Sequence, residues 1–282
     1  MTICVGVAVF DGIVFAADSA ASMVGINPSG QPAIRNVYNG GNKLFNLVRG
    51  LPIAAMTCGM GNFGSAPIAS MTKDLRKELS AEGSSRYLDP HAYSMKDVVD
   101  RVQGYFEEAF DRLDPKPLGS YTFEYWLGGY GSVSNGHEIW KISLANGKFS
   151  QPILALPSGE CGIVYSGQPE AINRLVMGYS PRFVEALLQA GMNPDMVQPL
   201  LQYAQQAANA EMLSAAMPIQ DAIDLADFLA DVTKRYVRFL PGADTVGGET
   251  DIAAVTRHER FKWIKRKHFY PAHLNPLETD HV

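Results

Sequence analysis

Short apolar segments dominate the beginning of the chain and predict β-strands. Residues 3–10 and 13–17 are rich in valine, isoleucine and phenylalanine, and Asp11-Gly12 separates them. An Asp-Gly pair between two such runs is typical of a tight β-hairpin. Residues 20–41, which are rich in glycine and proline, predict an inserted surface loop. Further strands are predicted at residues 43–48, 52–58, 121–131, 137–143, 149–155, 161–166, 251–256 and 260–265.

Helical spacing replaces this pattern in two parts of the chain. Residues 95–113 carry apolar side chains at intervals of three and four, behind Ser94, which fits an N-cap. An earlier helix is predicted at 64–80, and helices dominate from 169 to 239. The clearest apolar stripe in that region is Ile219, Ala222, Ile223, Ala226, Leu229, Val232 and Tyr236.

The order of these elements predicts the fold class. Strands come in groups rather than alternating with helices, which argues against a parallel sheet built from βαβ units. We therefore expect an α+β protein with two antiparallel sheets packed face to face and helices covering their outer faces. No repeat, low-complexity tract or interdomain linker interrupts the chain, so residues 1–282 are expected to form a single domain.

Composition narrows the function without naming it. The 282 residues are 46% hydrophobic, and a net charge of −5 gives no reason to expect nucleic acid or an anionic membrane as a partner. No apolar stretch approaches the ~20 residues of a membrane span, and no basic segment suggests a secretory signal. Cys4, Cys58 and Cys161 lie singly in apolar runs, as buried reduced thiols do. A cytoplasmic location is the resulting expectation.

Thr2 is the most informative candidate for chemistry. If Met1 is removed, Thr2 carries a hydroxyl and a free α-amine on one residue, which together form a nucleophile and its base. An α-amine titrates near pH ~7.7–8.0, so much of it can accept a proton at neutral pH. A threonine after the first methionine is common, however, and the other candidate residues also have purely structural interpretations when taken singly.

Several segments, taken together and in order, resemble proteasome β-type subunits, a family of N-terminal-nucleophile peptidases. Among its members the chain is most similar to the proteasome homologues of betaproteobacteria. The resemblance implies a four-layer αββα sandwich, the N-terminal-nucleophile hydrolase fold, with extra residues at 20–41, an extra helical segment at about 178–215 and a C-terminal tail at about 268–282. The segments that carry the resemblance are 2–7, 18–19, 42–45, 57–59, 165–168 and 244–248.

The resemblance also implies roles for individual residues. Thr2 would be the nucleophile, Asp18 would pair with Lys43 to assist proton transfer, and the N–H of Gly59 would hold the oxyanion. The residues that would complete the site are Ser166 and Asp244, around the amine of Thr2, and Ser22 and Thr57, which would contact substrate. The family usually has a serine shortly after the late aspartate, whereas this chain has Thr245, Val246 and two glycines.

The function implied is a threonine endopeptidase that needs no cofactor or metal. Stacked homo-oligomeric rings, most simply a tetradecamer, would enclose unfolded polypeptides or peptides, with an ATPase unfoldase as a further partner. Two alternatives stay open: an N-terminal-nucleophile amidase for small molecules, and a catalytically silent, proteasome-like ring scaffold.

Two other motifs favour structural interpretations. The glycines at 59, 61 and 64 match a dinucleotide-binding pattern, but no second strand with a terminal acidic residue follows at the required distance. The basic residues of 257–267 fit a charged last strand or a subunit interface better than a nucleic-acid site, because the chain as a whole is acidic. Its six histidines form no metal-ligand pattern.

Overall fold

One of the two large sheets contains the start of the chain. The computed structural model describes residues 2–28, 30–117 and 121–267. Five strands pair antiparallel in the order β13, β1, β2, β14, β15, and every residue of β1 and β2 is buried. The bounds are β13 (Gly162–Gly167), β1 (Ile3–Val9), β2 (Gly12–Ala17), β14 (Asp251–Thr256) and β15 (Arg260–Lys265). The predicted opening hairpin is confirmed.

A six-stranded antiparallel sheet faces the first one. Its order is β11, β10, β9, β6, β5, and β12 also pairs with β10. Side chains from both sheets, including Phe15, Met56 and Trp126, form the apolar cluster between them. Its bounds are β5 (Leu44–Asn46), β6 (Ile53–Gly59), β9 (Thr122–Gly129), β10 (Glu138–Ala145), β11 (Lys148–Phe149) and β12 (Ile153–Leu156).

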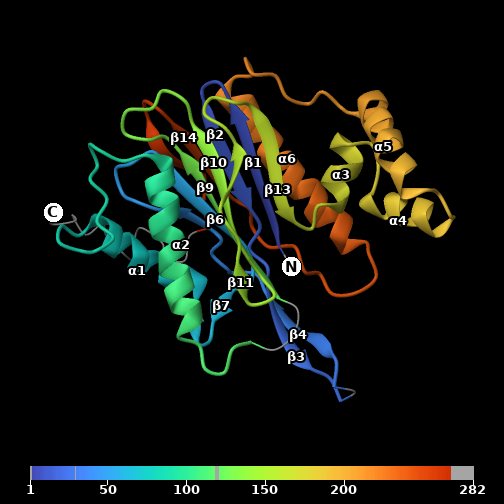
Figure 1. Cartoon of the computed structure of the whole chain (residues 1–282), viewed down its shortest axis with the longest axis horizontal. Helices are drawn as coiled ribbons and strands as arrows, with labels where there is room; N and C mark the ends of the chain where they lie inside the picture. Colours follow the sequence, from blue (N-terminus) through green and yellow to red (C-terminus); the bar gives the residue numbers. More distant parts are fainter. Residues whose placement is uncertain (1, 29, 118–120, 268–282) are drawn as a thin grey trace.

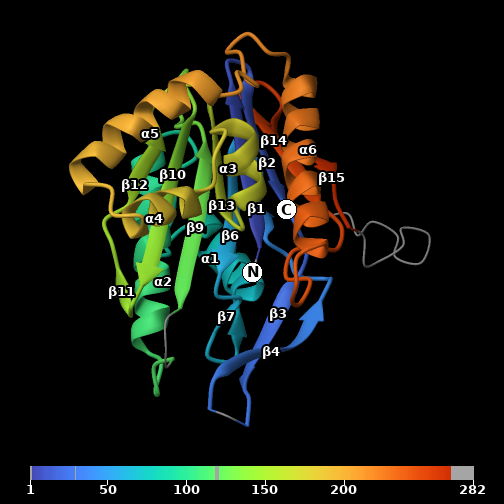
Figure 2. The ribbon, with the colours of Figure 1, turned by 90° about the vertical axis from the view of Figure 1, so that its right-hand side faces the viewer.

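Helices cover the outer faces of both large sheets (Figures 1 and 2). α1 (Ile68–Ser80) and α2 (Met95–Asp111) pack on the six-stranded sheet, while α3 (Glu170–Val176) and α6 (Ile219–Arg238) pack on the five-stranded sheet. The predicted cap at Ser94 is confirmed, because its hydroxyl oxygen accepts a hydrogen bond from the N–H of Asp97. Within the described residues, no helix is long and apolar enough to cross a membrane.

The segment expected as a loop at 20–41 is instead a two-stranded hairpin of β3 (Ala21–Ile26) and β4 (Pro32–Tyr38), projecting from the body (Figure 1). Glycines and prolines suggested a loop, but β-branched and aromatic residues such as Val24, Ile34 and Tyr38 stabilise paired strands. Gly30, at φ 77°, supplies the positive φ that the turn requires.

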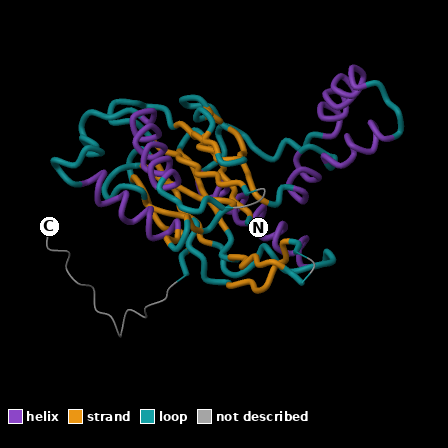
Figure 3. The backbone as a smooth tube through the Cα atoms, turned by 60° about the horizontal axis from the view of Figure 1, so that its bottom comes forward, coloured by secondary structure: helices purple, strands orange, loops and turns teal. Residues whose placement is uncertain are grey.

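The extra helical segment at 178–215 contains α4 (Pro181–Gln189) and α5 (Pro194–Ala208), which extend away from the two large sheets (Figure 3). α4 has no buried residue in this chain, and α5 buries only Val197 and Leu201. The tail predicted at 268–282 lies outside the described residues.

The prediction of a four-layer αββα sandwich made of two antiparallel sheets is therefore wrong. The described part of the chain is a mixed α/β structure with four antiparallel sheets and six helices. The β3–β4 hairpin and the small β7–β8 sheet, formed by β7 (Asn62–Phe63) and β8 (Ala66–Pro67), are the two additional sheets. Short local pairings of this kind leave too little periodicity in a sequence to be recognised.

Candidate active site

Thr2 lies directly before β1, an inner strand of the five-stranded sheet. Its side chain and backbone are almost fully buried, at 4% exposure. Its carbonyl accepts a hydrogen bond of 2.8 Å from the N–H of Gln168. Gly167, with φ 104°, permits this close approach, because a Cβ there would lie 1.9 Å from the carbonyl oxygen of Thr2. The end of β13 therefore fixes the backbone of Thr2.

Asp18 and Lys43 form a buried ion pair beside Thr2. Lys43 Nζ lies 2.6 Å from Asp18 Oδ1, and their side chains are 9% and 0% exposed. The same carboxylate oxygen accepts the N–H of Ile3 at 3.1 Å, and the second accepts the N–H groups of Ala20 at 3.1 Å and Gly247 at 3.0 Å. A buried ion pair needs such additional hydrogen bonds to offset desolvation. Because one of them comes from the residue after Thr2, the ion pair and Thr2 are held together.

One cavity of about 200 Å³ brings four of the predicted residues together. Thr2, Lys43, Thr57 and Gly59 all contribute to its lining. Gly59 has φ 90°, and a Cβ at this position would lie 2.1 Å from the carbonyl oxygen of Thr122. Only glycine fits this backbone without rearrangement.

The two predicted substrate-contacting residues lie differently. Thr57 lines the cavity, and its hydroxyl donates to the carbonyl of Glu124 at 3.3 Å. Ser22 lies on β3 and does not line the cavity, whereas its neighbour Ala21 does.

Ser166 faces the same side of the sheet as Thr2. It pairs with Cys4 across β1 and β13, and the hydrogen bond from the N–H of Gln168 to the carbonyl of Thr2 extends this pairing by one residue beyond β1. Thr2 lies two positions before Cys4, and side chains two residues apart in extended backbone point the same way. The hydroxyl of Ser166 donates to the carboxylate of Glu124.

Asp244 is separate from this group. It is exposed on the segment before β14, and within the described chain no hydrogen bond or ion pair joins it to another predicted site residue. Thr245, the residue after Asp244, is buried, and its hydroxyl has no hydrogen-bond partner among the described residues.

Glu124 is the site residue that the sequence analysis missed. It lies on β9 directly across from Cys58 on β6. The signal available was an acidic residue inside an otherwise apolar and aromatic strand, Phe123 to Leu127. Its partner Ser166 is 42 residues away in sequence and belongs to the opposite sheet. Sequence spacing therefore gave no reason to join the two.

The buried thiols at the site are unsuited to nucleophilic attack. Burial, followed by the negative charge of Glu124, raises the pKa of Cys58 to about 11. Burial also raises the pKa of Cys4 well above its ordinary value. Because the thiolate is the reactive form of cysteine, both residues stay unreactive at neutral pH. The hydroxyl of Thr2 is the better nucleophile candidate at this cavity.

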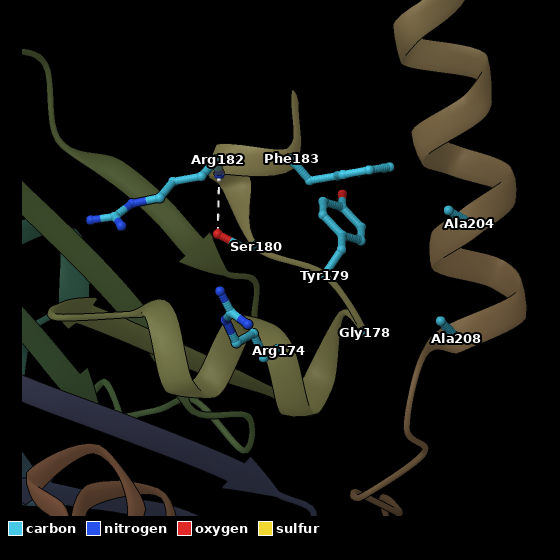
Figure 4. A pocket seen from close by; sticks show the side chains of 8 residues that line it. All are labelled: Arg174, Gly178, Tyr179, Ser180, Arg182, Phe183, Ala204 and Ala208. Carbon is cyan, nitrogen blue, oxygen red and sulfur yellow. Dashed lines mark hydrogen bonds between the residues drawn. The ribbon is translucent and has the colours of Figure 1, made fainter. Parts of the chain in front are cut away.

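A larger cavity, of about 550 Å³, lies between α3, α4 and α5 (Figure 4). Its polar groups mainly stabilise the local structure: Arg174 pairs with Glu170 at 2.7 Å, and Ser180 accepts the N–H of Arg182 at 3.2 Å, capping α4. Tyr179 and Phe183 turn toward α5 (Figure 4). The hydroxyl of Ser180 donates to the carboxylate of Glu170 at 2.9 Å, and the same oxygen caps α4, so Ser180 is explained by local structure and the size of the cavity alone does not indicate chemistry. In the described ranges, no three His, Cys, Asp or Glu side chains are grouped to hold a metal ion.

Comparison with solved structures identifies the fold. The chain is similar to Anbu (ancestral beta-subunit) from Yersinia bercovieri, with 15% identity and a TM-score of 0.54 over 94% of this chain and 88% of that one. It is also similar to a mutant Anbu from Hyphomicrobium sp. strain MC1, with 16% identity and a TM-score of 0.53 over 95% of this chain and 86% of that one. No family model and no curated protein sequence matches the chain.

These matches correct the resemblance drawn from the sequence. The assignment to proteasome β-type subunits, near the betaproteobacterial homologues, is wrong as to the group, because the matching structures are Anbu proteins, which are proteasome-like but distinct. The short motifs that suggested the group lie at strand ends, including those of β2, β6 and β13. Residues at these strand ends are typical of the fold that both groups share, so they do not distinguish one group from the other.

Proposed function

We propose that this chain is a threonine-type N-terminal-nucleophile peptidase subunit with a proteasome-like fold. The observation that carries the proposal is the shared cavity of Thr2, Lys43 and Gly59, with Lys43 paired to a fully buried Asp18. Acyl transfer at such a site uses a nucleophile, a nearby positive charge that assists proton transfer, and a backbone N–H that binds the oxyanion.

In the proposed reaction, Thr2 Oγ attacks the carbonyl carbon of a peptide bond. The α-amine of Thr2, freed by removal of everything before it, takes the hydroxyl proton and then passes it to the leaving amine. The positive charge of Lys43 favours the neutral amine and the developing alkoxide. The backbone N–H of Gly59 binds the oxyanion of the tetrahedral intermediate. Water activated by the same amine hydrolyses the resulting ester, which restores Thr2 and releases the acid.

The assembly is part of the proposal. Homo-oligomeric stacked rings, with a tetradecamer as the simplest form, would enclose the sites and admit unfolded polypeptides or peptides. An ATPase unfoldase is the partner that such a chamber would require for folded substrates. Native mass spectrometry of the full chain tests the ring, and stimulation of protein degradation by ATP and a cognate unfoldase tests the partner.

Mass spectrometry with a covalent probe tests the chemistry. Incubation with a β-lactone should add one acyl group to Thr2 of a chain that begins at that residue. The Thr2→Ser variant should keep the adduct, and Thr2→Ala should lose it. A wild-type protein with a blocked Thr2 and no adduct would contradict the peptidase proposal.

Two observations favour specific alternative functions. Asp244 is exposed and Thr245 lacks a hydrogen-bond partner in the described chain, which favours a silent scaffold. The cavity of about 200 Å³ is smaller than most ligand pockets, which span roughly 300–1,000 Å³, and this favours an amidase for small acyl groups. Absence of an adduct supports the scaffold, whereas an adduct together with hydrolysis of small amides but not of peptides supports the amidase.

A further inference from the structure

Glu124 lies beside the cavity that contains Thr2, and it has no role in the reaction proposed above. Its backbone carbonyl accepts the hydroxyl of Thr57, which lines the cavity. Its side chain is on the same face of the six-stranded sheet as that of Cys58, the residue before Gly59, because directly paired residues share a face. The carboxylate therefore lies in the space between the two large sheets, next to the strand that holds Thr2.

The carboxylate is fixed by three groups from three strands. Ser166 on β13 donates its hydroxyl proton to Oε2, and Trp126 Nε1 donates to the same oxygen at 3.3 Å. Lys141 Nζ on β10 lies 3.8 Å from Oε1, with both side chains about one quarter exposed, at 26% and 25%. This arrangement orients Glu124 toward Ser166 rather than toward bulk solvent.

The hydrogen bond to Glu124 decides what Ser166 can do. A serine hydroxyl has one proton to donate and two lone pairs that accept. With its proton committed to Glu124, Ser166 Oγ presents acceptor lone pairs on the face that it shares with Thr2. An acceptor in that position suits an amine, which has protons to donate.

We propose that Glu124 is the acidic positioning residue of this site, acting through Ser166 on the α-amine of Thr2. This inference rests on the proposed function. Asp244, which the family resemblance placed in this role, is exposed and outside the site, whereas Glu124 reaches Ser166 from β9. The acidic partner of the serine thus comes from the six-stranded sheet, and the late segment of the chain contributes the N–H of Gly247 to Asp18.

Other titratable groups also act on this position. Lys141 partly offsets the negative charge of Glu124. Lys43 and Asp18 are the other charged groups of the site, and they form an ion pair with each other. Cys58 lies directly across from Glu124, and burial followed by the charge of Glu124 raises the pKa of its thiol. For Cys4, burial and then Cys58 raise the pKa of the thiol most, and Glu124 contributes least. The field of the carboxylate therefore reaches the strand ends on which Thr2 and Gly59 lie.

The test compares two glutamates with matching local structure. Glu124→Gln removes the charge that acts on Ser166. Glu138→Gln is the control. Like Glu124, Glu138 accepts the indole N–H of the tryptophan two residues further along the chain, in this case at 2.6 Å. Within the described chain, Glu138 has no hydrogen bond to Ser166. The measured quantity is the β-lactone labelling rate of Thr2 from pH 5 to 9, per folded protein.

We expect Glu124→Gln to lower the plateau rate by about 10- to 100-fold, at or below the lower limit of a general-base effect, because Glu124 acts on the base indirectly. The acidic limb of the profile should move to lower pH by roughly 0.5–1 unit, because loss of a nearby negative charge lowers the pKa of an amine. Glu138→Gln should stay within about twofold of wild type at every pH.

A double variant tests whether the effect passes through Ser166. In a Ser166→Ala background, Glu124→Gln should add no further loss, because the coupled step is already absent. Additive losses in the double variant, or a pH profile of Glu124→Gln that matches the wild type, would overturn the inference. Labelling of wild-type Thr2 would still support the proposed function in that case. If the wild type is not labelled, the proposed function itself fails. If Ser166→Ala does not fold, the pH profile of Glu124→Gln alone decides.

Discussion

Two buried lysine–aspartate pairs lie side by side in this protein and have different surroundings. Asp18 follows β2 and pairs with Lys43, while Asp251 begins β14, across from Ala17, and pairs with Lys267. Their side chains are equally buried, at 9% and 0% for the first pair and 8% and 4% for the second. By burial and charge alone they cannot be told apart.

The two ion pairs differ in the residues that surround them. Lys43 lines the cavity that also contains Thr2 and Gly59. Lys267 does not line that cavity, and its ammonium donates to the hydroxyl of Ser19 at 2.7 Å. A buried ion pair in this protein therefore acquires a chemical role only where it lies beside a nucleophile, and otherwise joins strands.

The largest expected effect comes from removing each lysine in turn. Lys43→Met and Lys267→Met should each lower the free energy of unfolding by about 3–5 kcal/mol, because each leaves a buried carboxylate without its partner. Only Lys43→Met should also reduce the labelling rate of Thr2, by about 100-fold or more, since it removes the charge next to the reacting groups. Urea unfolding and β-lactone labelling per folded protein measure the two effects.

Equal loss of labelling in both variants would show that the two ion pairs do not differ in their effect on Thr2. It would mean that the second pair influences the site through Ser19, the neighbour of Asp18. Retention of labelling in Lys43→Met would remove Lys43 from the proposed chemistry.

The next effect concerns two glycines that line the same cavity. Gly59→Ala should cost at least about 2 kcal/mol of stability, because it combines a φ of 90° with a Cβ only 2.1 Å from the carbonyl oxygen of Thr122. Gly61→Ala is the control: nothing lies within 4 Å of its Cβ, and its φ is outside the strained range. Labelling of Thr2 should fall by about 100-fold in Gly59→Ala, as for loss of an oxyanion donor, and stay near wild type in Gly61→Ala.

Thermal unfolding and labelling rates of both variants check this prediction. Similar rates in Gly59→Ala and Gly61→Ala would show that the backbone at Gly59 is not used for the oxyanion.

The sequence predicted the parts of this molecule that depend on local signals. The opening hairpin follows from apolar runs around a turn, and α2 follows from helical spacing behind Ser94. The placement of Lys43, Thr57 and Gly59 around one cavity follows from their positions at or near the ends of β5 and β6.

What could not be predicted depends on pairings across the fold. Glu124 contacts Ser166 from the opposite sheet. Lys267, the last residue of the basic run 257–267 that indicated a charged strand or an interface, instead points inward and pairs with Asp251. The β3–β4 hairpin was missed because its glycines and prolines outweighed its strand-forming residues in the prediction. The Glu124–Ser166 and Asp251–Lys267 contacts depend on how strands pair and sheets pack, which spacing along one chain does not contain.

The most modest change is expected at Thr245, two residues before Gly247, whose N–H donates to Asp18. Its hydroxyl is buried with no hydrogen-bond partner in the described chain, so Thr245→Val replaces an unsatisfied polar group by an apolar one of similar shape. We expect stability to be unchanged or to rise by up to about 1 kcal/mol, because removal of an unpaired buried hydroxyl avoids its desolvation cost. Labelling of Thr2 should stay within about twofold of wild type. Urea unfolding and β-lactone labelling measure both quantities. A tenfold slower labelling rate at unchanged stability would instead assign the hydroxyl of Thr245 to the active site, as the substitute for the serine that the late segment lacks.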